Sequence, residues 1–259
     1  MNKRQVYSQF GIDYKDGKIL FDGAYIPELL VDGNSKLGKG IWTWSTLPGN
    51  MDYTVCYNGK TICAKGTCNC NCAGCYAQTG FYNMPNIKFG NAVKTVIARN
   101  HSEFMTSAII AQIWASNIKF VRIHASGDFF NDEYINAWKK IVAACPNCTF
   151  WTYTKNKIAE NSFDEYSNIN IVHSVIPNIG LNFGHCDYIM STYNELKDAG
   201  EKVYICRCGI DKNQHCTNCK GCSENKYVLF IEHSTAYKAE KDPMYDTIKS
   251  IIDAQGKGI

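Results

Sequence analysis

Clustered cysteines restrict the possible folds of this chain more than any other feature of its sequence. Fourteen cysteines occur in 259 residues, and eleven of them fall within residues 56–75 or 206–222. A disulfide scaffold is usually short and secreted. This chain is long, and its first basic residues lead into a polar stretch rather than the apolar run of a signal peptide. We therefore expect a cytoplasmic protein whose clustered thiols bind metal.

Composition indicates an ordinary globular protein. Hydrophobic residues make up 45% of the chain and charged residues 20%, which suits one main domain with a buried core. The net charge of +3 is too small to indicate nucleic-acid binding on its own. No apolar stretch approaches the roughly 20 residues that a membrane span needs, so no membrane association is expected.

Helical and strand patterns alternate from about residue 90 onward. The spacing of apolar residues predicts helices over 102–116, from 132 to just before Pro146 with Asn131 as N-cap, and over 244–254. Strands are predicted over residues 120–124, 149–154, 169–175, 188–190, 203–206 and 227–231. This alternation is typical of parallel βα units and predicts an α/β fold.

Polar residues follow several of these predicted strands. Ligands of parallel sheets gather at the carboxyl ends of the strands. We therefore expect one shared rim that carries Ser126, Gly127, Asp128, Thr154, Lys155, His173 and Ser174. The pattern leaves open whether the strands close into a barrel.

The first cysteine cluster contains the spacing Cys68-x3-Cys72-x2-Cys75. Three thiolates in one tight loop can hold a four-iron cubane and leave one iron open to a substrate or cofactor. The alternative is a closed structural zinc site with Cys63 as fourth ligand. The additional thiols Cys63 and Cys70 leave the ligand register open.

The run from Cys68 to Tyr76 resembles the cluster-binding signature of the radical S-adenosylmethionine (SAM) superfamily. The resemblance implies a partial TIM-like (βα)6 barrel, a [4Fe–4S] cluster, SAM bound to the open iron, and an electron donor such as flavodoxin or ferredoxin. It also implies that the cluster cleaves SAM reductively to a radical that abstracts hydrogen from the substrate. Residues 126–128 are similar in place to the superfamily's glycine-glycine-glutamate motif, so Asp128 is the candidate contact for the SAM amino group, with backbone carbonyls at Ser126 or Gly127 sharing it.

Further positions are assigned to this cofactor with less support from the motif. Tyr76 follows the last cysteine, whereas the superfamily's aromatic residue usually precedes it, so an adenine contact at Tyr76 departs from the pattern. Thr154 and Ser174 are assigned to ribose or carboxylate contacts because they end later strands.

A closer resemblance rests on four ordered segments: residues 75–77 (Cys-Tyr-Ala), 122–130, 150–155 and a terminal C-x2-C-x2-C. Together they resemble the gene product 88-like proteins of phages and plasmids over roughly residues 40–233. Because that family has no assigned substrate, the resemblance does not imply a particular reaction. Its occurrence in mobile elements places a nucleotide or nucleic acid first among the candidates.

The second cluster supplies four thiolates, Cys208, Cys216, Cys219 and Cys222. Four ligands close a metal site, either an auxiliary [4Fe–4S] cluster or a zinc ion. Cys206 ends a predicted strand and is an alternative to Cys208. Cys145 and Cys148 resemble a redox pair, but two thiols packed in a helix-to-strand connection are the simpler interpretation. Cys56 and Cys186 are expected in the core.

We thus expect a lead-in with the first strand over residues 1–55, a radical-SAM-like core over 56–200, and a C-terminal cysteine-rich segment with the last strand and helix over 201–259. The competing hypothesis is a zinc-stapled protein without redox chemistry, either structural or binding nucleic acid. A brown, oxygen-sensitive protein is expected under the first hypothesis and a colourless one under the second.

Overall fold

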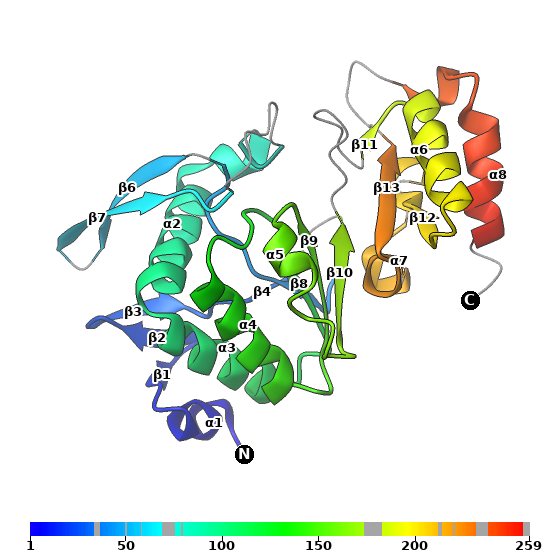
Figure 1. Ribbon diagram of the computed structural model, residues 1–259. Coiled ribbons are helices and arrows are strands. Elements are labelled where there is room, and N and C mark those ends of the chain that lie inside the picture. Colours follow the sequence, from blue (N-terminus) through cyan, green and yellow to red (C-terminus); the bar gives the residue numbers. More distant parts are fainter. Residues whose placement is uncertain are drawn as a thin grey trace.

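The computed structural model describes residues 1–33, 37–49, 51–57, 59–68, 76–78, 80–173, 183–211, 214–219, 221–231 and 238–255. It shows a mixed α/β protein (Figure 1). The main sheet has the strand order β10-β9-β8-β5-β4. Its parallel strands are β5 (Ile41–Thr43), β8 (Phe120–Ile123), β9 (Thr149–Thr154) and β10 (Ile169–His173), and β4 (Val31–Asp32) adds an antiparallel edge. None of the sheets in the described residues closes into a barrel.

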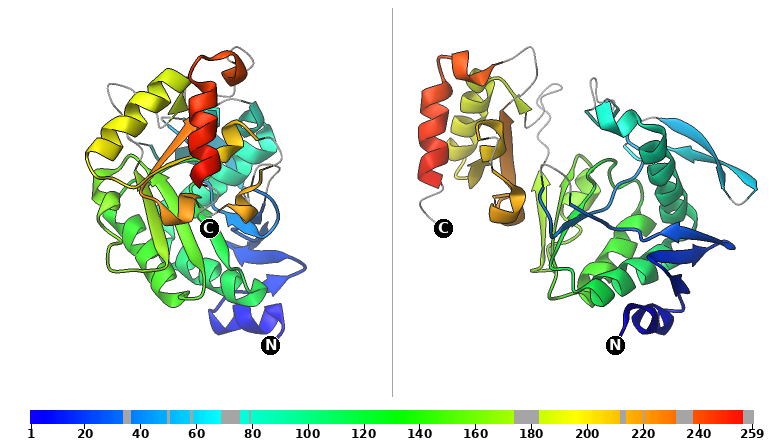
Figure 2. Two further views of the ribbon diagram at one scale, coloured as in Figure 1. Left: turned by 90° about the vertical axis from the view of Figure 1, so that its right-hand side faces the viewer. Right: turned by 180° about the vertical axis from the view of Figure 1, so that it is seen from behind.

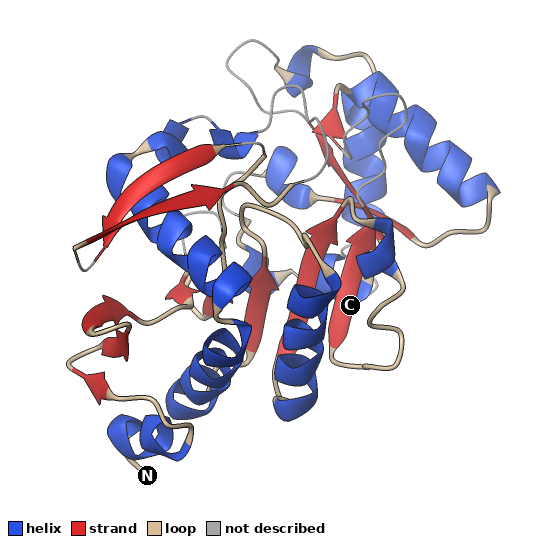
Figure 3. Ribbon diagram, turned by 60° about the vertical axis from the view of Figure 1, so that its left-hand side comes forward, coloured by secondary structure: helices blue, strands red, loops and turns tan. Residues whose placement is uncertain are grey.

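Helices α3 (Ser102–Ser116) and α4 (Asp132–Ala144) cover one face of this sheet (Figure 3). Helix α4 begins where predicted, because the Asn131 side chain accepts a hydrogen bond from the backbone N–H of Tyr134 at 2.9 Å. Its first turn carries Asp132 and Glu133, whose charges favour a helix N-terminus. Trp138 and Ile141 on its inner side are fully buried. The apolar periodicity of both helices was therefore a sound guide to the core.

The first third of the chain contains antiparallel elements that the sequence did not predict. Helix α1 (Lys3–Gln9) precedes a sheet of β1 (Tyr14–Lys15), β2 (Lys18–Phe21) and β3 (Ala24–Pro27). A hairpin of β6 (Asp52–Tyr57) and β7 (Lys60–Lys65) follows β5 and packs on α2 (Pro85–Asn100). Between hairpin and helix lie the 3-10 turns η1 (Tyr76–Gln78) and η2 (Gly80–Asn83). Residues 66–84 thus connect the hairpin to α2.

The C-terminal part builds a second, parallel sheet with the strand order β11-β13-β12. It contains β11 (Phe183–Gly184), β12 (Val203–Ile205) and β13 (Tyr227–Ile231). Helices α6 (Cys186–Asp198) and α8 (Tyr245–Gln255) pack on it, with α8 on the side away from the main sheet (Figure 2). Short elements complete the chain: α5 (Lys157–Glu160), η3 (Arg207–Gly209), η4 (Cys216–Asn218), α7 (Gly221–Glu224) and η5 (Ala239–Lys241).

The segment with the last cysteines returns to the main sheet. The side-chain amide of Asn170 on β10 donates hydrogen bonds to the carbonyls of Cys222 and Asn225, at 2.8 and 2.9 Å. Helix α7 is thereby fixed beside β10, and β13 also lies next to β10. The two parallel sheets are therefore joined at this edge.

Two sequence predictions were wrong. Residues 188–190 belong to α6 and form no strand, because Cys186, Ile189 and Thr192 are buried at the three-residue interval of a helix. Cys56 is exposed on the hairpin rather than part of the core, since β6 and β7 pack on α2 from one side. The α/β class and the other predicted strands and helices are confirmed within a few residues, whereas the domain boundaries stay a prediction.

Candidate functional site

The carboxyl ends of β5 and β8 continue side by side beyond the sheet and form the rim. The backbone N–H of Thr46 donates to the Ser126 carbonyl at 3.0 Å, and the Ser126 hydroxyl donates to the Thr46 carbonyl at 2.7 Å. Asn91 on α2 donates its side-chain amide to the Ser126 hydroxyl at 3.4 Å. Ser126 is buried, so its hydroxyl belongs to an internal hydrogen-bond network at this part of the rim, whereas Ser174 and the side chain of His173 lie outside the described residues.

Thr67, the residue before Cys68, belongs to this network. Its hydroxyl donates to the Leu47 carbonyl at 3.0 Å and accepts the backbone N–H of Asp128 at 3.0 Å. The hydroxyls of Thr46 and Thr67 lie 2.9 Å apart. The chain that enters the cysteine loop is therefore attached directly to the end of β8.

The chain that leaves the cysteine loop is attached to the same place. Tyr82 in η2 donates its hydroxyl to the carbonyl of Ala125 at 3.1 Å. Ala125 and Asp128 border the Ser126-Gly127 pair. Both flanks of residues 69–75 are therefore anchored on the same four-residue extension of β8.

Gly127 is required by this geometry. Its φ of +86° lies in the left-handed region that favours glycine. A Cβ atom there would collide with the hydroxyl oxygens of Thr46 and Thr67. The network leaves no room for a side chain at position 127.

The Asp128 carboxylate ties the ends of β8 and β9 together. Its Oδ1 accepts the hydroxyl of Thr154 at 2.6 Å and the backbone N–H of Phe129 at 2.7 Å, and its Oδ2 accepts the backbone N–H of Lys155 at 2.9 Å. A carboxylate offers about four acceptor sites, so these bonds use most of them. Thr154 also accepts the N–H of Asn156 at 3.0 Å. Both predicted cofactor contacts therefore already have structural partners.

The predicted cluster ligands are described in part. Cys68 lies half-buried just after β7, next to the rim. Cys63 is exposed on the hairpin. The side chain of Tyr76 and residues Cys70, Cys72, Cys75 and Ser174 lie outside what the structure describes.

A lysine near the rim was missed by sequence reasoning. The Lys94 amine on α2 lies 5.7 Å from the ring centre of Trp44, which follows β5. Burial lowers the pKa of Lys94 to about 8. A lone lysine in a helix carries no signal that distinguishes it from a solvated charge, so the sequence could not identify it.

His124, directly after β8, is a buried core residue. It is buried at a φ of +59°, and its Nε2 lies 2.9 Å from the Tyr134 hydroxyl, which also accepts the indole N–H of Trp44 at 2.7 Å. Its Nδ1 lies 3.3 Å from the hydroxyl of Thr152. Burial, with the charge of Arg122, lowers the pKa of His124 to about 3. The imidazole is neutral at physiological pH.

The C-terminal cysteines lie close to one another. Cys208, Cys219 and Cys222 pack against a buried cluster that contains Cys206 and Tyr204. The neighbouring Cys208 thiol, together with burial, raises the pKa values of Cys206 and Cys216. Burial also raises the pKa of Cys222 to about 11. In the residues that the structure describes, no three Cys, His, Asp or Glu side chains stand in a metal-binding arrangement, so metal binding by the second cluster stays a prediction.

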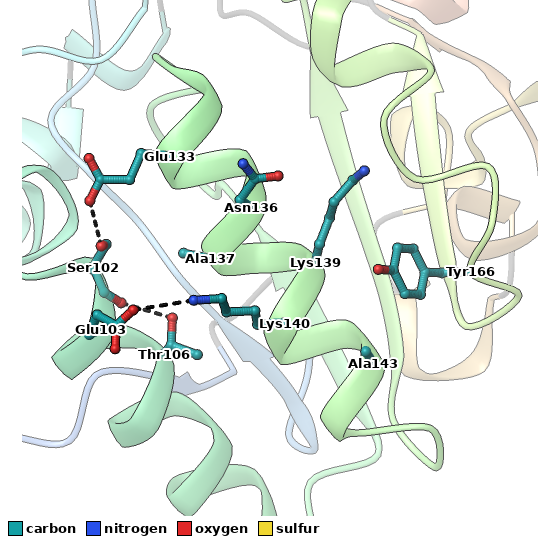
Figure 4. A pocket seen from close by; sticks show the side chains of 10 residues that line it. All are labelled: Ser102, Glu103, Thr106, Glu133, Asn136, Ala137, Lys139, Lys140, Ala143 and Tyr166. Carbon is teal, nitrogen blue, oxygen red and sulfur yellow. Dashed lines mark hydrogen bonds and ion pairs between the residues drawn. The ribbon is translucent and has the colours of Figure 1, made fainter.

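Two other features lie apart from the rim. Cys145 and Cys148 are buried in the main core, where burial raises the pKa values of both thiols, in accord with the simpler interpretation. A shallow pocket on the outer side of α3 and α4 has paired charges, among them Lys140 with Glu103 at 3.2 Å (Figure 4). Neither feature contributes to the candidate site.

The fold and rim define an α/β protein with a mostly parallel sheet, whose strand ends bind the residues on either side of the first cysteine cluster. The family model described as Gene product 88 matches residues 28–242, so the chain belongs to this family, as its ordered motifs predicted. The Gene 88 protein of Mycobacterium phage L5 is 42% identical over 41 residues, which are 16% of this chain and 17% of the phage protein. No solved structure matches. No helix among the described residues is long and apolar enough to cross a membrane.

Proposed function

We propose that the protein is a radical SAM enzyme whose [4Fe–4S] cluster is held by Cys68, Cys72 and Cys75. The observation that carries this proposal is the double anchoring of the cysteine loop. Thr67 on one flank and Tyr82 on the other both bind the extension of β8. The two described flanks of the segment that carries these three thiols are thereby attached beside the Ser126-Gly127-Asp128 turn.

The strand arrangement is compatible with a partial TIM-like barrel. The main sheet supplies four parallel strands, and β12 and β13 supply two more beside β10. We propose that these six strands correspond to a partial (βα)6 barrel whose carboxyl-end rim carries the site.

The residues of this chain would position the cofactors. The cluster and SAM would together supply one-electron reductive cleavage of SAM. Because Ser126 and Asp128 have structural partners, we assign the contact with the SAM amino group to the backbone carbonyl of Gly127. The rim network would hold that carbonyl rigid. A nucleotide or nucleic acid is the first candidate substrate, since a phage protein is among the similar proteins, and flavodoxin or ferredoxin is the expected electron donor.

Metal analysis of anaerobically purified protein tests this function. We expect about four irons with matching sulfide in the first site, and 5′-deoxyadenosine after reduction in the presence of SAM. Cys72→Ala should abolish 5′-deoxyadenosine formation, whereas Cys56→Ala, which removes an exposed thiol from the hairpin, should preserve it. Zinc without iron after anaerobic reconstitution would refute the proposal and favour a structural, zinc-stapled protein.

A further inference from the structure

Large apolar side chains are exposed on the segment that leads from the first cysteine cluster into α2. Phe81 lies in η2, Met84 directly precedes α2, and Ile87 and Phe89 lie in the first turns of that helix. Phe81 is 72% exposed, and the other three are 36–44% exposed. Single exposed apolar residues are normal on a protein surface, but four within nine residues are typical of a docking surface. We refer to these four residues as the apolar segment.

The apolar segment adjoins the candidate site. Tyr82, the neighbour of Phe81, donates its hydroxyl to the Ala125 carbonyl at 3.1 Å and so holds η2 at the rim. Helix α2, which continues the segment, lies between the hairpin of β6 and β7 and the main sheet (Figure 1). Asn91 on this helix binds the Ser126 hydroxyl. A molecule that covers the apolar segment would therefore lie next to the described flank of the first cysteine cluster.

The charge of this part of the chain has one sign. Residues 53–102 contain no Asp or Glu, but they contain five basic residues, which are Lys60, Lys65, Lys88, Lys94 and Arg99. Lys60 is paired with Asp22 from outside this range. Lys88, which stands between Ile87 and Phe89, forms no ion pair with a described acidic residue. The surroundings of the apolar segment therefore attract an acidic partner and repel a basic one.

This combination of side chains fits a protein better than a nucleic acid. Bases stack on aromatic rings, and Met84 and Ile87 offer none. Nucleic-acid interfaces are also more polar and much more positively charged than protein interfaces. By contrast, Phe and Met are enriched at the centres of protein interfaces, where charged residues are depleted. An acidic protein is therefore the occupant that the apolar segment and its charge favour.

We propose that the apolar segment, together with Lys88, docks an acidic electron-carrier protein of the flavodoxin type. This inference rests on the proposed function, in which each cleavage of SAM consumes one electron. The reduced flavin of the carrier would lose that electron and the [4Fe–4S] cluster would gain it, with no bond formed or broken between the two proteins. Docking at this surface would bring the carrier to the cysteines at the rim rather than to those near the C-terminus.

Calorimetric binding of an acidic flavodoxin to the anaerobically purified full chain tests the surface without any turnover. The double variant Phe81→Ser, Phe89→Ser should raise the Kd at least about tenfold, since central apolar residues dominate the binding energy of interfaces. Phe120→Ser is the matched control, because Phe120 is 44% exposed and lies at the start of β8, the opposite end of the main sheet. No binding of flavodoxin, or equal Kd values for the double variant and the unmutated protein, would overturn the proposal.

Reversal of one charge tests the electrostatic part of the proposal. Lys88→Glu should weaken binding at low salt, and its Kd should approach that of the unmutated protein at high salt, because salt screens exposed charges. A single-stranded oligonucleotide is titrated in parallel. An oligonucleotide that binds, and loses affinity in the double variant while flavodoxin does not bind, would make this a nucleic-acid surface and refute the docking of a protein.

A chemical reductant separates failure of the docking surface from failure of the proposed function. Dithionite needs no docking surface, so the double variant and the unmutated protein should form 5′-deoxyadenosine from SAM at the same rate with it. With limiting reduced flavodoxin, the double variant should be slower. No product from the unmutated protein with dithionite would refute the proposed function itself. Loss of dithionite-driven product in the double variant alone would show that these side chains shape the site, and would overturn the docking proposal.

Discussion

The hydroxyl of Thr67 accepts the backbone N–H of Asp128 at 3.0 Å, and this bond joins the residue before Cys68 to the end of β8. Thr67 is fully buried. If its hydroxyl were removed, water could not reach its three hydrogen-bonding partners, which are the Asp128 N–H, the Leu47 carbonyl and the Thr46 hydroxyl. The chain that leads into the first cysteine cluster is therefore fixed by the Thr67 hydroxyl, and Tyr82 fixes the chain that follows the cluster.

We expect Thr67→Val to reduce the free energy of unfolding by about 2 kcal/mol. The substitution keeps the shape of the side chain but leaves the buried N–H of Asp128 without its acceptor, which typically costs about 1–3 kcal/mol. Thr61→Val, on the exposed face of the same hairpin, is the matched control. Urea unfolding of the three proteins measures the difference, and equal stabilities for both variants would contradict the role of Thr67.

Gly127→Ala should destabilise the protein more than Gly17→Ala, because the two glycines share a left-handed backbone but only Gly127 is closely surrounded. Gly17 has a similar φ of +77°, but no atom lies within 4 Å of the position its Cβ would take. Gly17→Ala should therefore show the conformational cost alone, about 1 kcal/mol. Gly127→Ala adds the collision with Thr46 and Thr67, and overpacking of this kind costs about 1–3 kcal/mol more. Similar melting temperatures for both variants would show that the rim is less tightly packed.

His124 should make the stability of the protein depend on pH. The pKa of His124 in the folded protein is about 3, below the ordinary value of 6.5, so the unfolded chain takes up a proton that the folded chain excludes. Its contribution is complete above pH 6.5 and is lost as the pH falls toward 3, at up to about 1.4 kcal/mol per pH unit.

The measurement is the free energy of unfolding between pH 7 and pH 4.5. His124→Asn should flatten this dependence, since asparagine tolerates the left-handed backbone of position 124 and does not titrate. A slope that is the same in both proteins would show that His124 can be protonated in the folded state.

The main sheet and its helices were predictable because their signals are local. Asn131 before an acidic turn marked the start of α4, and the strand predicted over residues 149–154 coincides with β9. Among the missed antiparallel strands, β1 and β4 have only two residues each, too few for a pattern, whereas the longer β6–β7 hairpin is largely exposed and shows no apolar alternation. The error at residues 188–190 arose because a short apolar run fits a strand as well as one face of a helix.

The spacing of the sequence motifs predicted where the candidate site lies, but not which of its residues form hydrogen bonds with one another. Motif reasoning correctly predicted that Ser126, Gly127 and Asp128 follow a strand. It could not show that Thr154 and Lys155 bind the Asp128 carboxylate, because residues 26 and 27 positions away meet only once the sheet has formed. Thr67 directly precedes Cys68 in the sequence, but no local sequence pattern indicates that its hydroxyl binds the backbone of Asp128 after β8.

The face of the main sheet opposite α3 and α4 is covered by a segment that the ribosome makes much later than the sheet. Arg122, Trp151 and Tyr153 emerge well before the segment from Cys206 to Cys222 that covers them. During synthesis, a sheet with its helices in place on one side therefore exposes aromatic side chains on the other. Such surfaces promote aggregation of nascent chains. Chaperone dependence should accordingly be greatest in the interval before the last cysteines leave the exit tunnel.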